Sequence, residues 1–349
     1  MAGVERLVVA LVALATAGAG AADYGGAPAL ATFGLATLAL AGLAWTVSFA
    51  TEQVGGRLGP GATGVLQSTL GNLPEFFVVI FALNAGKTVV AQTSIIGSIF
   101  ANALLVLGLV VVAGARHSGD GIMRFQRKLP NDTATLLMLS VFTIVLVGIS
   151  VASSDRASHH VKGLSIVASA CLLVVYSAWV IPYVRSGADG ERREHAPRVP
   201  TRLAVALLLA GGVGSAFVSD WFVAELSPAM DALHLSDAFA GLVVVAIAGN
   251  AVENFAGIML AAKGQSDLAI SVVKNSVSQV AVFLFPLLVL VSLFFATPLT
   301  FSLAPVYIGA LALTALAVWQ ITGDGEAAAF EGVALLGLYA ILATLTVYE

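Results

Sequence analysis

Long apolar segments recur along the whole chain, separated by short connections such as YGGAP, GGRLGPG and TGDGE. If about 18 or more mostly apolar residues count as one membrane span, the pattern predicts about eleven helices. The expected spans are residues 5–22, 28–50, 61–85, 90–114, 132–152, 161–184, 202–219, 236–262, 267–294, 302–321 and 330–347. This pattern is typical of an all-α polytopic membrane protein.

The composition agrees with this class and excludes others. Of 349 residues, 59% are hydrophobic and 10% are charged, and the mean hydropathy is +0.97. A soluble globular domain needs more polar surface than that. The sequence has no Walker loop, paired CxxC or HExxH motif, so it carries no nucleic-acid or soluble-enzyme signature. We expect the lipid bilayer as a partner, no nucleic acid and no resident cofactor, and we leave a homo-oligomer open.

The positive charges in the connections predict the orientation. With the N-terminus inside, twelve fall on the cytoplasmic side: Arg6, Arg57, Arg116, Arg124, Arg127, Lys128, Arg185, Arg192, Arg193, Arg198, Arg202 and Lys263. Three fall on the opposite side: Lys87, Arg156 and Lys162. We therefore predict a multi-pass protein of a prokaryotic inner membrane with a cytoplasmic N-terminus.

Residues 1–22 leave two interpretations open. MAGVERLVVALVALATAGAGAA has a basic residue, an apolar core and small residues at its end, as a cleavable signal has. We favour an uncleaved span. The orientation of the later spans is the same in either case.

Two expected spans carry polar motifs that a lipid-facing helix would not. GNLPEFF occupies residues 71–77 and GNAVENF occupies residues 249–255. A shift of 178 positions superposes the two motifs, together with a serine that follows each glutamate by 23 residues. The superposed pairs are Gly71 and Gly249, Asn72 and Asn250, Glu75 and Glu253, Gly86 and Gly264, and Ser98 and Ser276.

These matches indicate that the second to sixth and the seventh to eleventh spans are two copies of one five-helix unit. Because five is odd, the copies enter the membrane from opposite sides. Inverted repeats of this kind are typical of secondary transporters, whose binding sites lie where the repeats meet. We expect an N-terminal helix or signal with its linker at 1–27, repeats at 28–185 and 202–349, and a cytoplasmic linker at 186–201, with the ion site at the interface of the repeats.

Glu75 and Glu253 are the main candidates for a functional site. A charged group near the middle of a membrane costs roughly 2.5 kcal/mol or more, so it is a functional candidate by default. The plainer alternative is a protonated glutamate that is hydrogen-bonded to a neighbouring helix. With the asparagines and serines of both motifs, the two carboxylates offer oxygen ligands, which suit a hard divalent cation such as Ca²⁺. Since an empty pair should hold protons, the cation and protons would compete for one site.

The same stretches resemble the paired repeat signatures of the calcium/proton exchangers, the CAX branch of the calcium/cation antiporter superfamily. GNLPEFFVVIFAL with SIIGSIFANALLVLG, and GNAVENFAGIML with SVSQVAVFLFPLLVL, carry this resemblance, which runs from about residue 40 to the C-terminus. It implies eleven helices around a cation site, where Glu75 and Glu253 exchange Ca²⁺ for protons. It also implies supporting ligands or gate residues: Asn72, Asn250, Ser98, Asn102, Ser276 and Gln279. Glu52 and Glu225 match acidic positions near the cavity entrances, although a solvated helix end fits each equally.

Two departures from the family pattern concern the coupling. The family usually has histidine directly after the second motif glutamate, where this chain has Asn254, which cannot titrate. Lys274 stands where the family has an apolar residue. It lies about 200° around a helix from Ser276, so we expect it to face away from the site and to extend its amine to the cytoplasmic surface. An ion pair between Lys274 and Glu253 is the alternative.

The sequence therefore predicts a secondary transporter, not an enzyme, that exports Ca²⁺ from the cytoplasm in exchange for H⁺ by alternating access. The alternative is a sodium-coupled antiporter, or one for another divalent cation such as Mn²⁺, with the same architecture. Sodium-coupled members of the superfamily usually have Thr-Ser in place of the motif asparagine, which favours protons here. The repeat and the buried acids disfavour a channel or a scaffold, and the catalytic dyad of an intramembrane protease is not evident.

Overall fold

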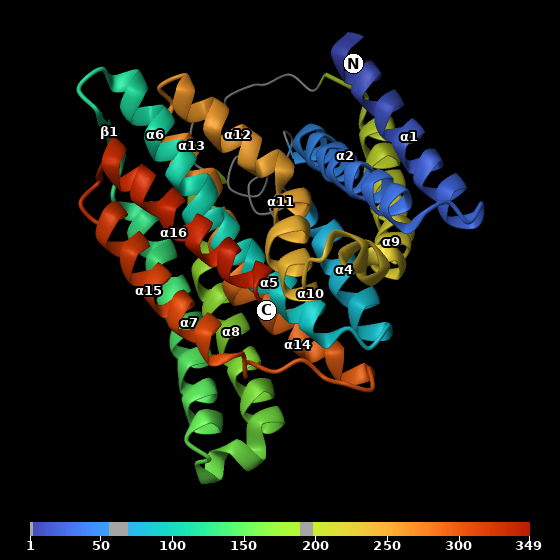
Figure 1. Ribbon diagram of the computed structural model, residues 1–349. Coiled ribbons are helices and arrows are strands. Elements are labelled where there is room, and N and C mark those ends of the chain that lie inside the picture. Colours follow the sequence, from blue (N-terminus) through green and yellow to red (C-terminus); the bar gives the residue numbers. More distant parts are fainter. Residues whose placement is uncertain (1–2, 56–68, 189–197) are drawn as a thin grey trace.

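The computed structural model describes residues 3–55, 69–188 and 198–349, without the side chains of residues 186–188, 252 and 253. Nearly all of the described chain is helical (Figure 1). The elements are α1 (Gly3–Tyr24), α2 (Ala29–Gly55), α4 (Leu73–Asn84), α5 (Thr88–Phe100), η1 (Ala101–Val106), α6 (Leu107–Ser118), β1 (Ile122–Arg124), α7 (Lys128–Ala152), η2 (Arg156–His160), α8 (Val161–Ala188), α9 (Thr201–Leu233), α10 (Asp237–Phe239), η3 (Ala240–Val245), α11 (Ala246–Gly249), α12 (Ala251–Ala262), α13 (Ser266–Gln279), η4 (Val280–Leu284), α14 (Phe285–Val291), η5 (Ser292–Phe294), α15 (Pro305–Thr322), β2 (Glu326–Ala328) and α16 (Ala329–Val347). Of the η segments, η1, η3 and η4 are π-helical, and η2 and η5 are 3₁₀ turns.

The described part of the chain has nine helices long and apolar enough to cross a membrane. A pair bent by 57°, Asp237–Gly249 with Asn254–Ala262, raises the number to ten if it forms one span. The predicted all-α polytopic membrane fold is thus confirmed. The number eleven stays a prediction, because the expected span 61–85 begins among residues that lie outside the described ranges.

The two halves of the chain have matching elements. α4 and α12 each contain 12 residues, and each ends in a turn with a glycine, Gly86 or Gly264, at φ +73°. Glycine adopts this left-handed conformation without the strain that a Cβ atom would add. The next helix in each half, α5 or α13, continues into a π-helical segment, η1 or η4. The offset of 178 residues between the two sequence motifs is therefore also the offset between matching elements, as expected for a repeat.

The two halves meet closely where α5 crosses η3. A Cβ atom added to Gly97 would lie 2.6 Å from Leu242 Cα, and one added to Gly241 would lie 2.0 Å from Thr93 Oγ1. Gly97 is thus required by the backbone of η3, and Gly241 by the side chain of Thr93 and the backbone amide of Ser94. This crossing brings the first half of the chain against the second directly beside Ser98.

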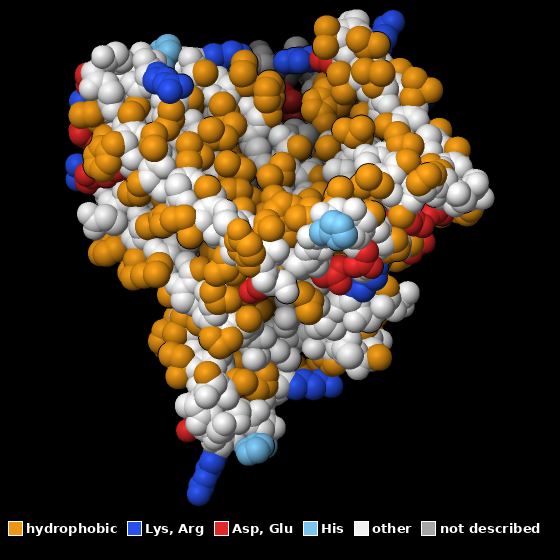
Figure 2. All heavy atoms as spheres, viewed as in Figure 1, with side chains coloured by type: hydrophobic (Ala, Val, Ile, Leu, Met, Phe, Trp, Pro, Cys, Tyr) orange, Lys and Arg blue, Asp and Glu red, His pale blue; other side chains and the backbone are white. Residues whose placement is uncertain are grey.

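The surface suits a lipid environment. Large apolar side chains are exposed on several helices, among them Phe142 of α7, Phe217 of α9 and Leu313 of α15. In Figure 2 hydrophobic side chains cover the middle of the visible face, and many of the charged ones lie toward its ends. The hairpin of α7 and α8 projects from the body of the molecule (Figure 1).

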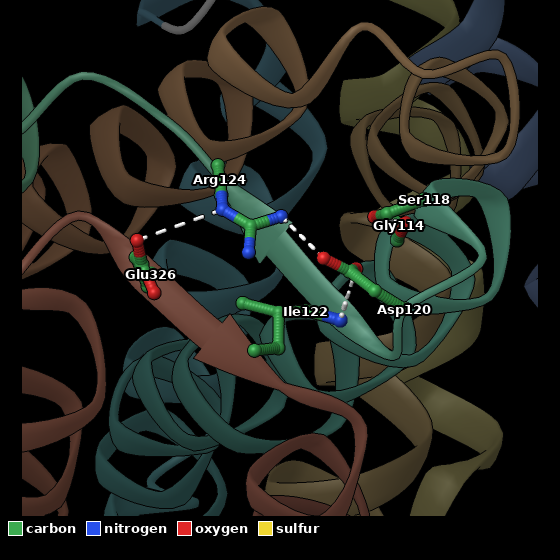
Figure 3. A network of polar contacts seen from close by, with 6 residues as sticks. All are labelled: Gly114, Ser118, Asp120, Ile122, Arg124 and Glu326. Atoms are coloured by element: carbon green, nitrogen blue, oxygen red, sulfur yellow. Dashed lines mark hydrogen bonds and ion pairs between the residues drawn. The ribbon is translucent and has the colours of Figure 1, made fainter.

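A small polar network joins two distant loops (Figure 3). β1 and β2 pair in an antiparallel sheet, with Arg124 opposite Glu326. Arg124 Nη1 donates to Asp120 Oδ2 at 2.7 Å, and its Nε lies 3.6 Å from Glu326 Oε1. The hydrogen bond from Arg124 lowers the pKa of Asp120 below its ordinary value. The sequence did not predict these strands, since three-residue segments have no usable period.

Candidate functional site

Both polar motifs interrupt their helices at the asparagine. Asn72 precedes α4 with φ −83° and ψ 6°, and Asn250 separates α11 from α12 with φ −104° and ψ 10°. Pro74 lies in the first turn of α4, where its missing amide does not disturb the helix. Each break therefore places an asparagine and the glutamate that follows it at the start of a new helix inside the protein.

A chain of buried amide and hydroxyl groups links the two halves. Asn102 Nδ2, in η1, donates to Asn250 Oδ1 at 3.3 Å and to Ser276 Oγ, in α13, at 3.2 Å. Asn250 Nδ2 donates to Ser98 Oγ, in α5, at 3.0 Å. The four side chains are at most 1% exposed. The structure thus brings together four of the expected site residues, two from each half.

Glu75 lies against the second motif. Its side chain is 1% exposed, and a Cβ atom added to Gly249 would lie 3.8 Å from Glu75 Cβ. The backbone of the second motif at Gly249 therefore lies close to the side chain of Glu75. The backbone of Glu253 lies in the first turn of α12, but its side chain is outside the described part, so its expected position opposite Glu75 stays a prediction.

Several buried oxygens of the expected site residues have no donor. Asn72 Oδ1, Asn102 Oδ1 and Gln279 Oε1 accept no hydrogen bond from the residues that the structure describes. A buried acceptor without a partner costs about 1–3 kcal/mol, and a bound cation would remove that cost. Calcium prefers carboxylate and amide oxygens of this kind. The residues present therefore fit a hard cation as cargo.

Gln279 is held by a residue that sequence reasoning missed. Its Nε2 donates to the hydroxyl of Tyr176, in α8, at 3.0 Å, and both side chains are buried. This hydrogen bond fixes the amide nitrogen of Gln279 and leaves its amide oxygen available to another partner. Ser219 of α9 was also missed, and its hydroxyl donates to the Pro74 carbonyl at 3.4 Å. Each contact crosses more than 100 positions of sequence, and neither side chain belongs to a motif.

The expected position of Lys274 is partly wrong. Its Nζ donates to Thr322 Oγ1 of α15 at 3.2 Å, whereas Ser276 on the same helix faces Asn102. Lys274 thus points away from Ser276, as predicted. However, it is only 1% exposed, so its amine does not reach the surface. The reason is tertiary packing that the sequence pattern does not contain: α7 packs against both α13 and α15, and Thr322 of α15 reaches the buried amine.

The two acids expected near the cavity entrances lie in different surroundings. Glu52 is exposed near the end of α2. The pKa of Arg198 is raised mainly by its hydrogen bond to Glu5, at 3.0 Å, and further by the charge of Glu52. Glu225 is half-buried in α9 and lies within electrostatic range of Lys87. Each acid therefore has a basic neighbour, and the role of each at an entrance stays a prediction.

Residues 28–182 and 203–348 match the family described as "Sodium/calcium exchanger protein". The chain belongs to this family. Its two matched segments hold the two polar motifs, one in each.

Individual members are similar over most of the chain. A vacuolar calcium ion transporter of Schizosaccharomyces pombe is 32% identical over 90% of this chain and 78% of its own length. A Ca(2+)/H(+) antiporter of Synechocystis is 31% identical over 89% of each chain. The solved structure of native YfkE is similar with a TM-score of 0.82, at 26% identity, over 98% of this chain and all of that one.

Proposed function

We propose that this protein is a secondary transporter that exchanges Ca²⁺ for H⁺ across the membrane. The observation that carries the proposal is the buried cluster of Asn102, Asn250, Ser98 and Ser276, in which both halves contribute oxygen and amide groups beside Glu75. The similarity to a protein named Ca(2+)/H(+) antiporter over 89% of the chain supports the choice of both ions. Alternating access then follows from the repeats, which can face one side of the membrane at a time.

The proposed site works by competition. When it is empty, Glu75 and Glu253 hold protons, because two carboxylates in a low-dielectric interior repel each other when ionised. An arriving Ca²⁺ is coordinated by both ionised carboxylates, the oxygens of Asn72, Asn102 and Gln279, and the serine hydroxyls. The protons leave to the side from which the cation arrived. Return of the protonated site to the other side completes the exchange.

The direction of transport follows from the ion gradients. Where the proton gradient is directed into the cell, protons that enter through the site drive Ca²⁺ out of the cytoplasm. The excess of Lys and Arg in the connections assigned to the cytoplasm supports a cytoplasmic N-terminus. A prokaryotic inner membrane is the location that we propose.

The test is Ca²⁺ uptake into liposomes that contain the purified protein and an internal Ca²⁺ indicator. An outward proton gradient or an outward sodium gradient is imposed in separate samples. We expect uptake with the proton gradient, abolished by a protonophore, and none with sodium. Uptake driven by sodium alone would assign the protein to sodium-coupled exchange, and Mn²⁺ uptake without Ca²⁺ uptake would change the cargo.

A further inference from the structure

A lysine ties the two halves together away from the cation site. Lys87 lies in the turn between α4 and α5, and its Nζ donates to the backbone carbonyl of Val223, in α9, at 2.6 Å. We call this hydrogen bond the Lys87 tether. The acceptor is the neighbour of Ala224, whose carbonyl loses its helical donor because Pro228 has no backbone N–H. The tether therefore joins the first motif hairpin to a proline-containing helix of the second half.

Two acids surround this lysine. Burial lowers the pKa of Lys87, while the charges of Asp237 and Glu225 oppose that effect. Asp237 begins α10, and its Oδ1 accepts a hydrogen bond from Ser227 of α9 at 3.2 Å. The ammonium thus lies where the α4–α5 turn, α9 and α10 meet.

The halves are in backbone contact next to the tether. α5 begins directly after Lys87, and η3 follows α10. Farther along, Gly97 meets Leu242 and Gly241 meets Thr93, with no room for even one added methyl group. Because α5 and η3 are in direct contact here, a cation cannot pass between them to Ser98 in this conformation. This route from the face that carries Lys87 is closed.

The equivalent turn of the other half, between α12 and α13, has a lysine at a different position, and this residue, Lys263, is exposed. The position that corresponds to Lys87 in the second half is Gln265, which also precedes its helix with nearly the same backbone, φ −90° and ψ 61° against −83° and 64°. Gln265 is exposed and carries no charge. The tether is therefore a feature of one face of the transporter.

We propose that Lys87 is a positioning residue that holds this face closed and that must release Val223 before the face can open. The inference rests on the proposed exchange function, because alternating access requires each face to open in turn. When the tether breaks, α5 separates from η3, and Glu225 and Asp237 lose their basic neighbour. The two acids then face the solution and attract the divalent cation.

The test measures opening directly, without transport. Thr93, buried against Gly241, becomes a reporter as Thr93→Cys in a Cys171→Ser background, which removes the one native cysteine. The rate at which a membrane-impermeant thiol reagent labels the reporter in proteoliposomes is compared with Lys87 intact, with Lys87→Met and with Lys87→Arg. Lys162→Met, at an exposed lysine, is the matched control.

We expect Lys87→Met to raise the labelling rate about tenfold or more, since a hydrogen bond from an ammonium is among the stronger polar contacts. Lys87→Arg should restore slow labelling, and Lys162→Met should not change it. An unchanged rate in Lys87→Met, or an equal rise in Lys162→Met, would overturn the proposal. If Lys87→Met does not elute as a folded protein, Lys87→Gln replaces it with the residue found at Gln265. The labelling rate does not depend on which ion is transported. A negative result in the Ca²⁺ uptake assay would therefore contradict the proposed cargo without deciding whether Lys87 holds the face closed.

Discussion

Replacing Asn102 by alanine removes a side chain that hydrogen-bonds two residues of the second half at the candidate site. The variant loses the hydrogen bonds from Nδ2 to Asn250 Oδ1 (3.3 Å) and to Ser276 Oγ (3.2 Å). Hydrogen bonds between membrane helices contribute about 0.6 kcal/mol on average and up to about 1.7, so the pair contributes about 1.2 to 3.4 kcal/mol. If Asn102 Oδ1 is also a ligand, Ca²⁺ affinity should fall about tenfold, or about 1.4 kcal/mol.

The assay is thermal unfolding of the purified protein in detergent, with and without Ca²⁺. A cation that binds only the folded state raises the melting temperature by an amount that depends on its affinity, so one experiment reports both stability and binding. Asn275→Ala is the matched control, because Asn275 is half-buried and, among the residues that the structure describes, its amide contacts Ser271 of its own helix, at 3.5 Å. The reasoning is refuted if Asn102→Ala and Asn275→Ala melt at the same temperature and if Ca²⁺ raises both melting temperatures by the same amount.

Three further predictions concern the crossing of the halves, the support of the site and the polar network. Gly97→Ala should slow exchange about tenfold or more in the liposome assay, because its methyl would lie 2.6 Å from the backbone of η3. Gly337→Ala is the control and should not slow exchange, since in the described part of the chain no other helix or side chain lies within 4 Å of the added methyl. Tyr176→Phe removes the hydroxyl that holds the site glutamine and should raise the KM for Ca²⁺ about threefold with an unchanged maximal rate. The pKa of Asp120 is lowered in the folded protein by the hydrogen bond from Arg124, so Arg124→Gln should raise it. In the wild type, the stabilisation by the ionised carboxylate is present above the ordinary pKa of 3.8 and is lost as the pH falls through the folded pKa. The difference in melting temperature between this variant and the wild type should therefore shrink as the pH falls below that value, and a difference that is constant with pH would contradict the assignment.

The sequence contained most of the fold because the membrane constrains it strongly. Only helices and closed barrels satisfy every backbone group in lipid, so apolar segments of sufficient length could be interpreted as helices. The matched motifs at Asn72 and Asn250 then predicted the repeat, and the structure places equal helices at the same offset. The π-helical segments η1 and η4 were not predicted, since a single inserted residue in a helix barely changes its apolar pattern.

The sequence predicted which residues form the site, but it did not predict the contacts that hold those residues in place. Asn102, Asn250, Ser98 and Ser276 were expected together and do lie together. Tyr176 and the burial of Lys274 depend on which helices pack side by side, which one sequence does not specify. The same is true of β1 and β2, which pair across about 200 positions between two loops.

Ca²⁺-dependent proton release tests the two-glutamate site most directly. Purified wild-type protein, Glu75→Gln, Glu253→Gln and the exposed control Glu326→Gln are titrated with Ca²⁺ in weakly buffered detergent solution, while a pH indicator and a calorimeter record protons and heat. The account predicts proton release and Ca²⁺ binding in the wild type and in Glu326→Gln, and the loss of both in Glu75→Gln and Glu253→Gln. Proton release that persists unchanged in either of these two variants would contradict it.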